Sequence, residues 1–353
     1  MNLNQETDAS VRELLLESDT TSADQVASGV SRFLESLEDQ IQNSIDYLDS
    51  DDAERSIKID PYWPKWHSPW WHMTALHELG LAKRIPSKGL ELFVEGIDRY
   101  LHFFPFTEAD VPNDRDPISD VICICALATA ERVLRASGVD VDSRLPWLRE
   151  WFTNYQLPDG GYNCDEAAYA KNGKSSMIST IHMMESMLER LQQGLLNEPE
   201  RACLDKSAAY VIERRLIRSI SKNGELMDPL WCELTFPRFY ELDILRAIRC
   251  IVSWATLREK QLPWSAIVET VRLLDAKMRA NGSLGVERDF YTSCRTRLPL
   301  ADGTWLKKRP VSVFPLLTEV SRMGHASCPL LTKSWLETLQ LLRAADQRGL
   351  VTE

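Results

Sequence analysis

The sequence has no basic tract and no long apolar run. Its 353 residues include 41 Lys and Arg against 52 Asp and Glu, which gives a formal net charge of −11. Such an excess of acidic groups argues against nucleic acid as a partner. The longest apolar run, 121–130, is about half of the ~20 residues that span a bilayer. We therefore expect no transmembrane segment, while peripheral membrane contact stays open.

A secretory signal is also lacking, because residues 1–22 are polar and acidic. The eight cysteines are scattered, and only Cys123 and Cys125 lie close together in the sequence. Two helical positions separated by one residue point to different faces, so this pair favours reduced thiols over a disulfide framework. These features predict a cytoplasmic protein, and they leave its oligomeric state open.

Motifs of several common enzyme classes are missing as well. The sequence contains no phosphate-binding glycine loop, no G-x-S-x-G elbow and no H-E-x-x-H helix. A kinase, a serine hydrolase of the α/β type and a zinc-dependent protease are therefore disfavoured.

Apolar residues instead recur every three or four positions, which predicts an all-α protein without strands. We expect residues 1–22 to form a loose lead-in and 23–353 a single domain. The expected helices cover 23–49, 73–81, 86–103, 118–136, 144–155, 174–191, 199–220, 239–257, 264–280, 311–323 and 334–348.

Glycine turns separate the predicted helices at regular intervals. Those at Gly160, Gly224 and Gly282 lie about 60 residues apart, the length of two helices and two connections. A helical hairpin cannot bury its apolar stripe alone, so such units must stack or close. About six hairpins predict an (α/α) toroid, a double ring of helices. A fourth turn at Gly303 follows too soon to continue the repeat.

The first of these turns carries a family resemblance. Residues 156–166 read Gln-Leu-Pro-Asp-Gly-Gly-Tyr-Asn-Cys-Asp-Glu, and Gln156, Gly160 and Tyr162 match the turn of squalene–hopene cyclases, Q-x3-G-x-W with a variable aromatic. With Ser175-Ser176 and the block 236–246, this stretch resembles bacterial squalene cyclase-like and prenyltransferase-like proteins. The resemblance implies a toroid whose inner helices surround a central cavity. It also implies cyclase, lyase, isomerase or transferase chemistry on a small, largely apolar substrate such as an isoprenoid.

The sequence departs from that family at its catalytic motifs. The acidic D-x-D-D motif of the cyclases is matched only by Asp49-Ser50-Asp51-Asp52, upstream of the core resemblance. Protein prenyltransferases hold zinc with aspartate, cysteine and histidine, and no D-x-C motif is present.

Two polar clusters are the candidate sites for acid–base chemistry. The candidate catalytic residues are Asp165, Glu166, His182, Asp228 and Asp243. Cys164 is a candidate ligand for zinc or another divalent metal, and no other cofactor is indicated. In the competing interpretation Cys164 packs in the core, Asp165 caps a helix, His182 is a buried structural histidine and Asp243 pairs with a nearby arginine.

Aromatic and polar side chains near these clusters are candidates for binding the substrate. They are Trp70, Trp71, His72, Tyr162, Asn163, Trp231, Arg238 and Tyr240. A metal site formed by His67, His72 and His77 alone is disfavoured, because residues five apart on a helix do not share a face. Two other functions stay open: a non-catalytic toroid that binds a ligand or a protein, and a carbohydrate-active toroid with paired carboxylates.

Overall fold

The computed structural model describes residues 12, 23–117, 119–171, 173–292, 295–308 and 313–353. The predicted lead-in, 1–22, lies outside these residues except for Arg12. As expected, the described chain is mostly helical. Its longer helices are α2 (Ala23–Glu35), α3 (Glu38–Leu48), α4 (Asp51–Ile59), α5 (Pro69–Glu78), α6 (Ser87–Asp98), α7 (Ile124–Ser137), α11 (Met177–Gln192), α12 (Glu198–Glu213), α13 (Ile244–Arg258), α14 (Trp264–Lys277), α15 (Pro315–Ala326) and α16 (Pro329–Gln347).

Shorter elements fill the connections. The short α-helices are α8 (Val141–Arg144), α9 (Trp151–Asn154) and α10 (Ala167–Ala170), and the 3₁₀ turns are η1 (Ala82–Arg84), η2 (Glu108–Asp110), η3 (Pro146–Glu150), η4 (Pro229–Cys232) and η5 (Phe290–Thr292). The helix expected over 144–155 is therefore broken into η3 and α9.

The expectation of a chain without strands is wrong in two places. Strand β1 (Leu262–Pro263) pairs in parallel with β4 (Val351–Thr352), and β2 (Thr296–Pro299) pairs antiparallel with β3 (Trp305–Lys308). The glycine turn at Gly303 is thus the tip of a β-hairpin. Strands of two to four residues are too short to produce a recognisable alternation of apolar and polar positions.

Two helix boundaries differ from the sequence prediction with consequences for the site. The segment 23–49 forms two helices, and Asp49 to Asp52 belongs to the start of α4, where the Ser50 hydroxyl accepts from the Ala53 N–H at 3.2 Å. Helix α7 begins at Ile124, six residues later than expected. Cys123 therefore precedes the helix, with an extended backbone at φ −74° and ψ 150°.

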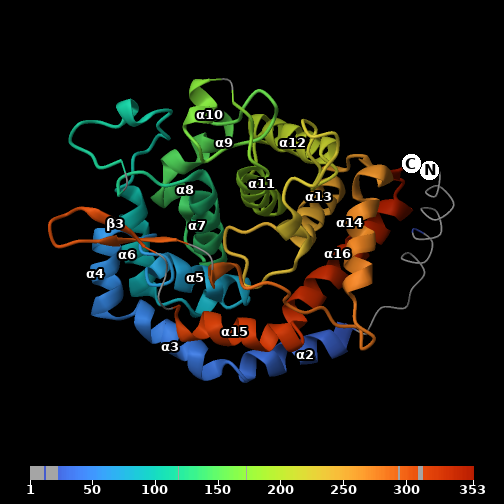
Figure 1. The fold of residues 1–353 in the computed structure, drawn as a ribbon, viewed down its shortest axis with the longest axis horizontal. Helices are drawn as coiled ribbons and strands as arrows, with labels where there is room; N and C mark the ends of the chain where they lie inside the picture. Colours follow the sequence, from blue (N-terminus) through green and yellow to red (C-terminus); the bar gives the residue numbers. More distant parts are fainter. Residues whose placement is uncertain (1–11, 13–22, 118, 172, 293–294, 309–312) are drawn as a thin grey trace.

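The longer helices follow one another around the molecule (Figure 1). Helices α3, α5, α7, α11, α13 and α16 contact each other in that order, and α2 contacts α16. The helices α4, α6, α12 and α14 pack against the outer side of this series in the view of Figure 1. No helix of the described chain combines the length and the apolar character that crossing a bilayer requires.

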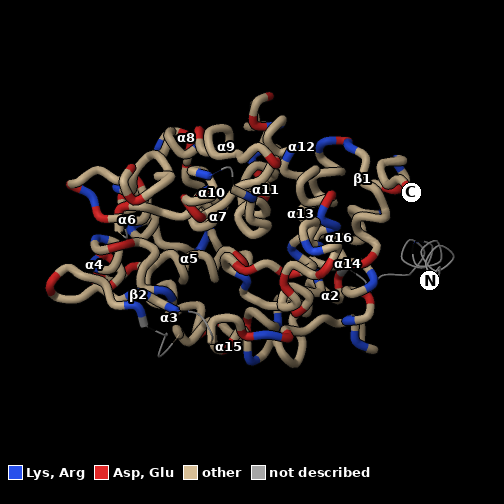
Figure 2. The backbone as a smooth tube through the Cα atoms, turned by 45° about the horizontal axis from the view of Figure 1, so that its top comes forward, with Lys and Arg blue, Asp and Glu red and all other residues tan. Residues whose placement is uncertain are grey.

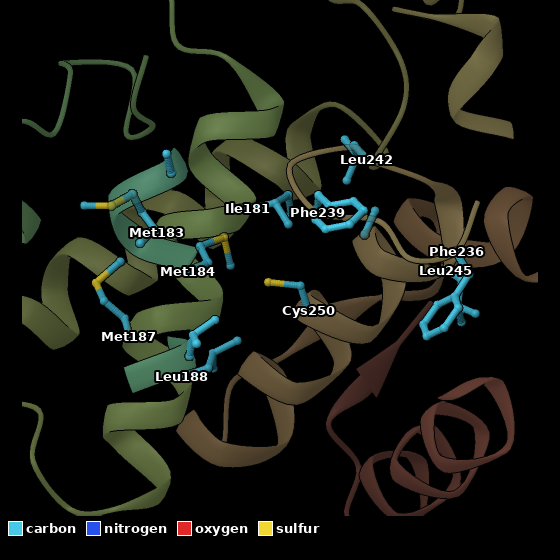
Figure 3. Packing of buried hydrophobic residues seen from close by; sticks show 14 of the residues in the cluster. Ile181, Met183, Met184, Met187, Leu188, Phe236, Phe239, Leu242, Leu245 and Cys250 are labelled. Atoms are coloured by element: carbon cyan, nitrogen blue, oxygen red, sulfur yellow. The ribbon is translucent and has the colours of Figure 1, made fainter. Parts of the chain in front are cut away.

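The core between neighbouring helices is apolar and rich in sulfur. Figure 3 shows Ile181 and Met184 of α11 facing Phe239 and Cys250 on the side of α13. All four side chains are at most 3% exposed. Met184 follows Ile181 by three positions, so both lie on the face of α11 that the helical period turns towards α13.

The turn at 156–166 is fixed by backbone geometry. Gly160 has φ +95°, and a Cβ atom there would lie 2.7 Å from the carbonyl oxygen of Lys206. The amide of Gln156 donates to the carbonyl oxygens of Gly160 at 2.9 Å and Cys203 at 2.7 Å, which ties the turn to α12. Tyr162 is fully buried, and its hydroxyl donates to Phe152 O at 2.5 Å. This architecture places Cys164 and Glu166 directly after an anchored turn.

Candidate functional site

A cavity of about 510 Å³ lies where several helix connections meet. Its walls come from 62–65 ahead of α5, from 100–123 between α6 and α7, and from Cys164 and Glu166 ahead of α10. Arg297 of β2 and Lys307 of β3 complete the lining. The Lys65 N–H donates to the Thr296 hydroxyl at 2.7 Å and so attaches the β2–β3 hairpin to this wall.

The wall of the cavity combines aromatic rings with charges of both signs, and the cations outnumber the two carboxylates, Glu108 and Glu166. Its rings belong to Tyr62, Trp63, Tyr100 and Phe104, and its cations to Lys65, Arg297 and Lys307. The Lys65 ammonium lies 4.3 Å from the centre of the Tyr240 ring and donates to its hydroxyl at 3.0 Å. Figure 2 shows Lys and Arg positions beside β2. Such a wall suits a molecule with an apolar body and an anionic group.

A buried carboxyl group stands behind one of these rings. Asp60 Oδ1 accepts from the Tyr100 hydroxyl at 2.9 Å and from the N–H groups of Tyr62 at 2.7 Å and Trp63 at 2.8 Å. Asp60 Oδ2 is buried and has no hydrogen-bond partner among the described residues. Burial raises the pKa of Asp60 from 3.8 to about 7, against the effect of these hydrogen bonds. The hydrogen bond between Tyr100 and Asp60 therefore connects the cavity wall to a carboxyl group that titrates near neutral pH.

Three thiols meet at the same cavity. Cys125 Sγ lies 3.3 Å from Cys123 Sγ and 3.4 Å from Cys164 Sγ. Cys164 Sγ also accepts from the Cys125 N–H at 3.3 Å and from the Ser179 hydroxyl at 3.2 Å. Contacts with the thiols of Cys123 and Cys125, together with these donors, hold the pKa of the Cys164 thiol well below its usual range. Cys123 and Cys164 line the cavity directly.

A second, much smaller cavity of about 50 Å³ contains an ionic cluster. Glu185 accepts from Arg132 at 2.5 Å and from Arg246 at 2.7 Å. Burial alone would raise the pKa of Glu185, but the two arginine charges hold it far below its usual range. Burial also lowers the pKa of His77 to about 3. The charges of Glu185 and the two arginines compensate one another. The cavity beside them has room for little more than water molecules.

The three aspartates predicted to be catalytic all cap turns or helices. Asp165 is exposed and accepts from the Ala167 N–H at 3.0 Å, and Asp228 accepts from the Leu230 N–H at 2.9 Å. Asp243 is buried, accepts from the Arg246 N–H at 2.8 Å and lies 3.6 Å from the Arg238 guanidinium. The contacts of Asp165 and Asp243 are those of the competing structural interpretation, which made no statement about Asp228. Glu166 lies on the wall of the 510 Å³ cavity.

The predicted histidines occupy buried polar positions. His182 has Nδ1 at 2.8 Å from Ile178 O and Nε2 at 3.2 Å from Phe239 O. Burial lowers its pKa to about 4. His72 stacks on Phe314 at 4.0 Å and lines a separate cavity of about 480 Å³, to which Asp52 of the acidic motif also contributes. The structure thus brings together one residue of that motif and one predicted substrate-binding residue, away from the thiols.

Most other predicted substrate-binding residues pack or form turns. Trp70 and Trp71 are buried, and their indole N–H groups donate to Ala126 O at 3.1 Å and Tyr62 O at 2.8 Å. Asn163 donates to Lys174 O at 2.7 Å. Tyr162 and Trp231 are buried, Arg238 lines the 50 Å³ cavity, and Tyr240 contacts Lys65 of the 510 Å³ cavity.

Several residues of the 510 Å³ cavity are absent from the sequence prediction. Asp60 and Tyr100 gave no signal, because they are 40 positions apart and meet only through tertiary structure. Cys123 and Cys125 did give one, since Cys-x-Cys is a close pair of thiols. The expected helix over 118–136 separated the two side chains, whereas the later start of α7 brings them together. Comparison of this chain with protein-family models, curated proteins and solved structures finds no match.

Proposed function

We propose that this protein is an enzyme that acts by acid–base chemistry on a small, largely apolar molecule with an anionic group, bound in the 510 Å³ cavity. The Asp60–Tyr100 hydrogen bond carries this proposal, because it connects a carboxyl group of pKa about 7 to the cavity wall. A general acid or base works best when its pKa lies near the working pH. As a base, Tyr100 takes a proton from the substrate while its own proton moves to Asp60 Oδ1; the reverse transfer delivers a proton.

The lining of the cavity supports this substrate class. The aromatic rings of the wall offer apolar surface to a hydrocarbon chain, while Lys65, Arg297 and Lys307 supply cations for an anionic group. Its volume falls within the range of small-molecule sites, ~300–1,000 Å³. An isoprenoid diphosphate combines the two required parts, and we propose this class as the substrate.

We further propose that the helices form an (α/α) toroid. The order of contacts from α3 to α16, and the contact of α2 with α16, support a closed arrangement. In this arrangement the cavity lies among the connections at one end of the ring, where loops can vary without disturbing the helices.

The binding half of the proposal is tested by calorimetry with farnesyl diphosphate, farnesol and inorganic diphosphate. We expect farnesyl diphosphate to bind most tightly, because it alone uses both the rings and the cations. Arg297→Gln should weaken its binding several-fold and leave farnesol unaffected. Lys333→Gln, an exposed charge on α16, is the matched control. Equal binding of farnesyl diphosphate to all three proteins would contradict the role of the cavity cations.

The catalytic half is tested by following product formation from farnesyl diphosphate by mass spectrometry. Tyr100→Phe should remove turnover while keeping binding, because only the proton carrier is lost. Tyr47→Phe is the control, since Tyr47 lines the separate 480 Å³ cavity and donates to His67 O at 2.5 Å. Undiminished turnover in Tyr100→Phe would reject the acid–base role of this pair.

A carbohydrate-active enzyme is a second candidate, favoured by Glu108 and Glu166, which both line the cavity. Paired carboxylates and aromatic rings are the usual elements of glycoside hydrolysis. Binding of oligosaccharides in place of the isoprenoid probes, abolished by Glu166→Gln, would support this alternative.

A further inference from the structure

The three thiols of the cavity are close enough to share one ion. All three Sγ atoms, of Cys123, Cys125 and Cys164, lie within 4.8 Å of one another. They come from two chain segments, since Cys164 is 39 residues beyond Cys125. No other group of three or more cysteine, histidine, aspartate or glutamate ligand atoms with this spacing occurs in the described parts of the chain.

Local backbone geometry produces this convergence. Cys123 is the residue before the first turn of α7 and has an extended conformation, whereas Cys125 is the second residue of the helix. The change from extended to helical backbone between them brings both sulfurs to one side. The anchored turn at 156–162 then delivers Cys164 to the same point.

We propose that Cys123, Cys125 and Cys164 bind one Zn²⁺ ion as thiolates and leave its fourth coordination position open to the 510 Å³ cavity. Zinc–sulfur bonds of about 2.3 Å in a tetrahedron place the sulfurs about 3.8 Å apart. Cys125 Sγ lies 3.3 Å from Cys123 Sγ and 3.4 Å from Cys164 Sγ, so these two pairs need to spread by only a few tenths of an ångström. Soft sulfur ligands select zinc over magnesium or calcium.

The surroundings of the sulfurs suit a negatively charged metal–thiolate group. Three thiolates and one Zn²⁺ ion carry a net charge of −1, which the N-terminal end of α7 stabilises. Cys164 Sγ accepts hydrogen bonds from the Cys125 N–H and the Ser179 hydroxyl. Hydrogen bonds of this kind orient a metal ligand and adjust its basicity.

The open position distinguishes a catalytic from a purely structural zinc site. Structural sites close the tetrahedron with four protein ligands, whereas catalytic sites keep one position for water or substrate. Cys123 and Cys164 both contribute to the cavity wall, so an ion between them contacts the contents of the cavity. A zinc ion there would polarise an anionic or carbonyl oxygen of the bound molecule. This catalytic role rests on the proposed function, whereas zinc binding itself does not.

A disulfide is the competing use of these thiols. It would join two of the sulfurs and leave the third without a role. The two donors to Cys164 Sγ stabilise a thiolate, which a disulfide does not contain. The arrangement of three mutually close sulfurs therefore favours a metal ion over a redox pair.

Metal content of the full chain, purified under reducing conditions without chelator, tests the proposal directly. We expect one zinc per chain in the wild type by elemental mass spectrometry. Cys123→Ser, Cys125→Ser and Cys164→Ser should each lose most of it. Cys232→Ser is the matched control and should keep it, because that half-buried thiol lies outside the cluster. Full zinc retention in all three cluster variants would overturn the proposal.

A spectroscopic measurement on the unmodified chain removes any dependence on how the variants fold. After zinc is removed with a chelator, Co²⁺ alone is added to the reduced wild-type protein. We expect a thiolate-to-cobalt charge-transfer band that saturates at one equivalent and disappears when Zn²⁺ is added. Absence of the band, or a wild-type mass lower by two hydrogens from a disulfide that persists under reductant, would reject the metal centre.

The zinc site and the proposed substrate can be rejected independently of each other. The metal measurements need no substrate, and the binding of farnesyl diphosphate can be measured on zinc-free protein. Zinc without binding of any of the three probes would retain the metal centre and reject the proposed substrate. Binding that depends on Arg297 in a protein that takes up neither Zn²⁺ nor Co²⁺ would do the opposite.

Discussion

The hydroxyl of Tyr100 donates to Asp60 Oδ1 at 2.9 Å and joins a buried carboxyl group to the wall of the 510 Å³ cavity. Asp60 is 1% exposed, and its Oδ1 also accepts hydrogen bonds from the N–H groups of Tyr62 and Trp63. The same carboxyl group therefore organises the loop ahead of α5 and contacts a residue that lines the cavity.

Asp60 should make the stability of the protein depend on pH. Its pKa is raised from 3.8 to about 7, so the native state keeps a proton that the unfolded chain releases. The resulting stabilisation is complete below about pH 4 and is lost as the pH rises to about 7, with a slope of at most ~1.4 kcal/mol per pH unit. Urea unfolding across this range should show the slope in the wild type and not in Asp60→Asn, which keeps the Oδ1 acceptor. Parallel stability curves for the two proteins would contradict this assignment.

Gly160→Ala should destabilise the turn at 156–166 by two effects at once. The alanine would hold a positive φ of +95°, and its Cβ would lie 2.7 Å from the backbone oxygen of Lys206. We expect a loss of about 3 kcal/mol or more in the free energy of unfolding. Gly194→Ala is the matched control, because Gly194 has φ +72° with no atom within 4 Å of the added Cβ. It should lose only ~1 kcal/mol in urea denaturation; equal losses would show that the close contact with Lys206 is relieved without cost.

Glu131→Gln should be among the more damaging single substitutions away from the cavity. The Glu131 side chain is fully buried and contacts Arg190 at 2.5 Å, Arg135 at 2.8 Å and the Ser186 hydroxyl. Removing its charge leaves buried arginine charge without its main partner, at a cost of about 3–5 kcal/mol. The control is Glu38→Gln, whose carboxylate is 52% exposed and pairs with Arg84. Chemical denaturation should find no resolvable loss there, because an exposed ion pair is screened by solvent, and an equally small loss for Glu131→Gln would contradict the role of the buried network.

The sequence predicted well what depends on local physics. The apolar period gave the helical class and most of the helix positions, and Gln156, Gly160 and Tyr162 form an anchored turn with a buried ring. The β2–β3 hairpin was not predicted, because its strands are too short to show a recognisable alternation of apolar and polar residues. Yet this hairpin carries Arg297 and Lys307, two of the three cations of the cavity.

The candidate site could be predicted only in part. Cys164 and Glu166 follow the recognisable turn and do lie at the cavity. The sequence did not predict that Cys125 lies beside Cys164. The predicted helix began six residues too early, and within that helix the side chains of Cys123 and Cys125 would point to different faces. Asp60 depends on a long-range contact with Tyr100, and no local spacing encodes it. Sequence patterns locate turns more reliably than they locate the partners that folding brings to them.

The contact between α2 and α16 has a consequence for synthesis of the chain. Helix α2 leaves the ribosome well before α16, which follows it by most of the described chain. Until then Phe33, which is 6% exposed in the finished protein, lacks this neighbouring helix. Nascent chains that stop before residue 329 should therefore expose the apolar face of α2 to chaperones, and release from them should coincide with the synthesis of α16.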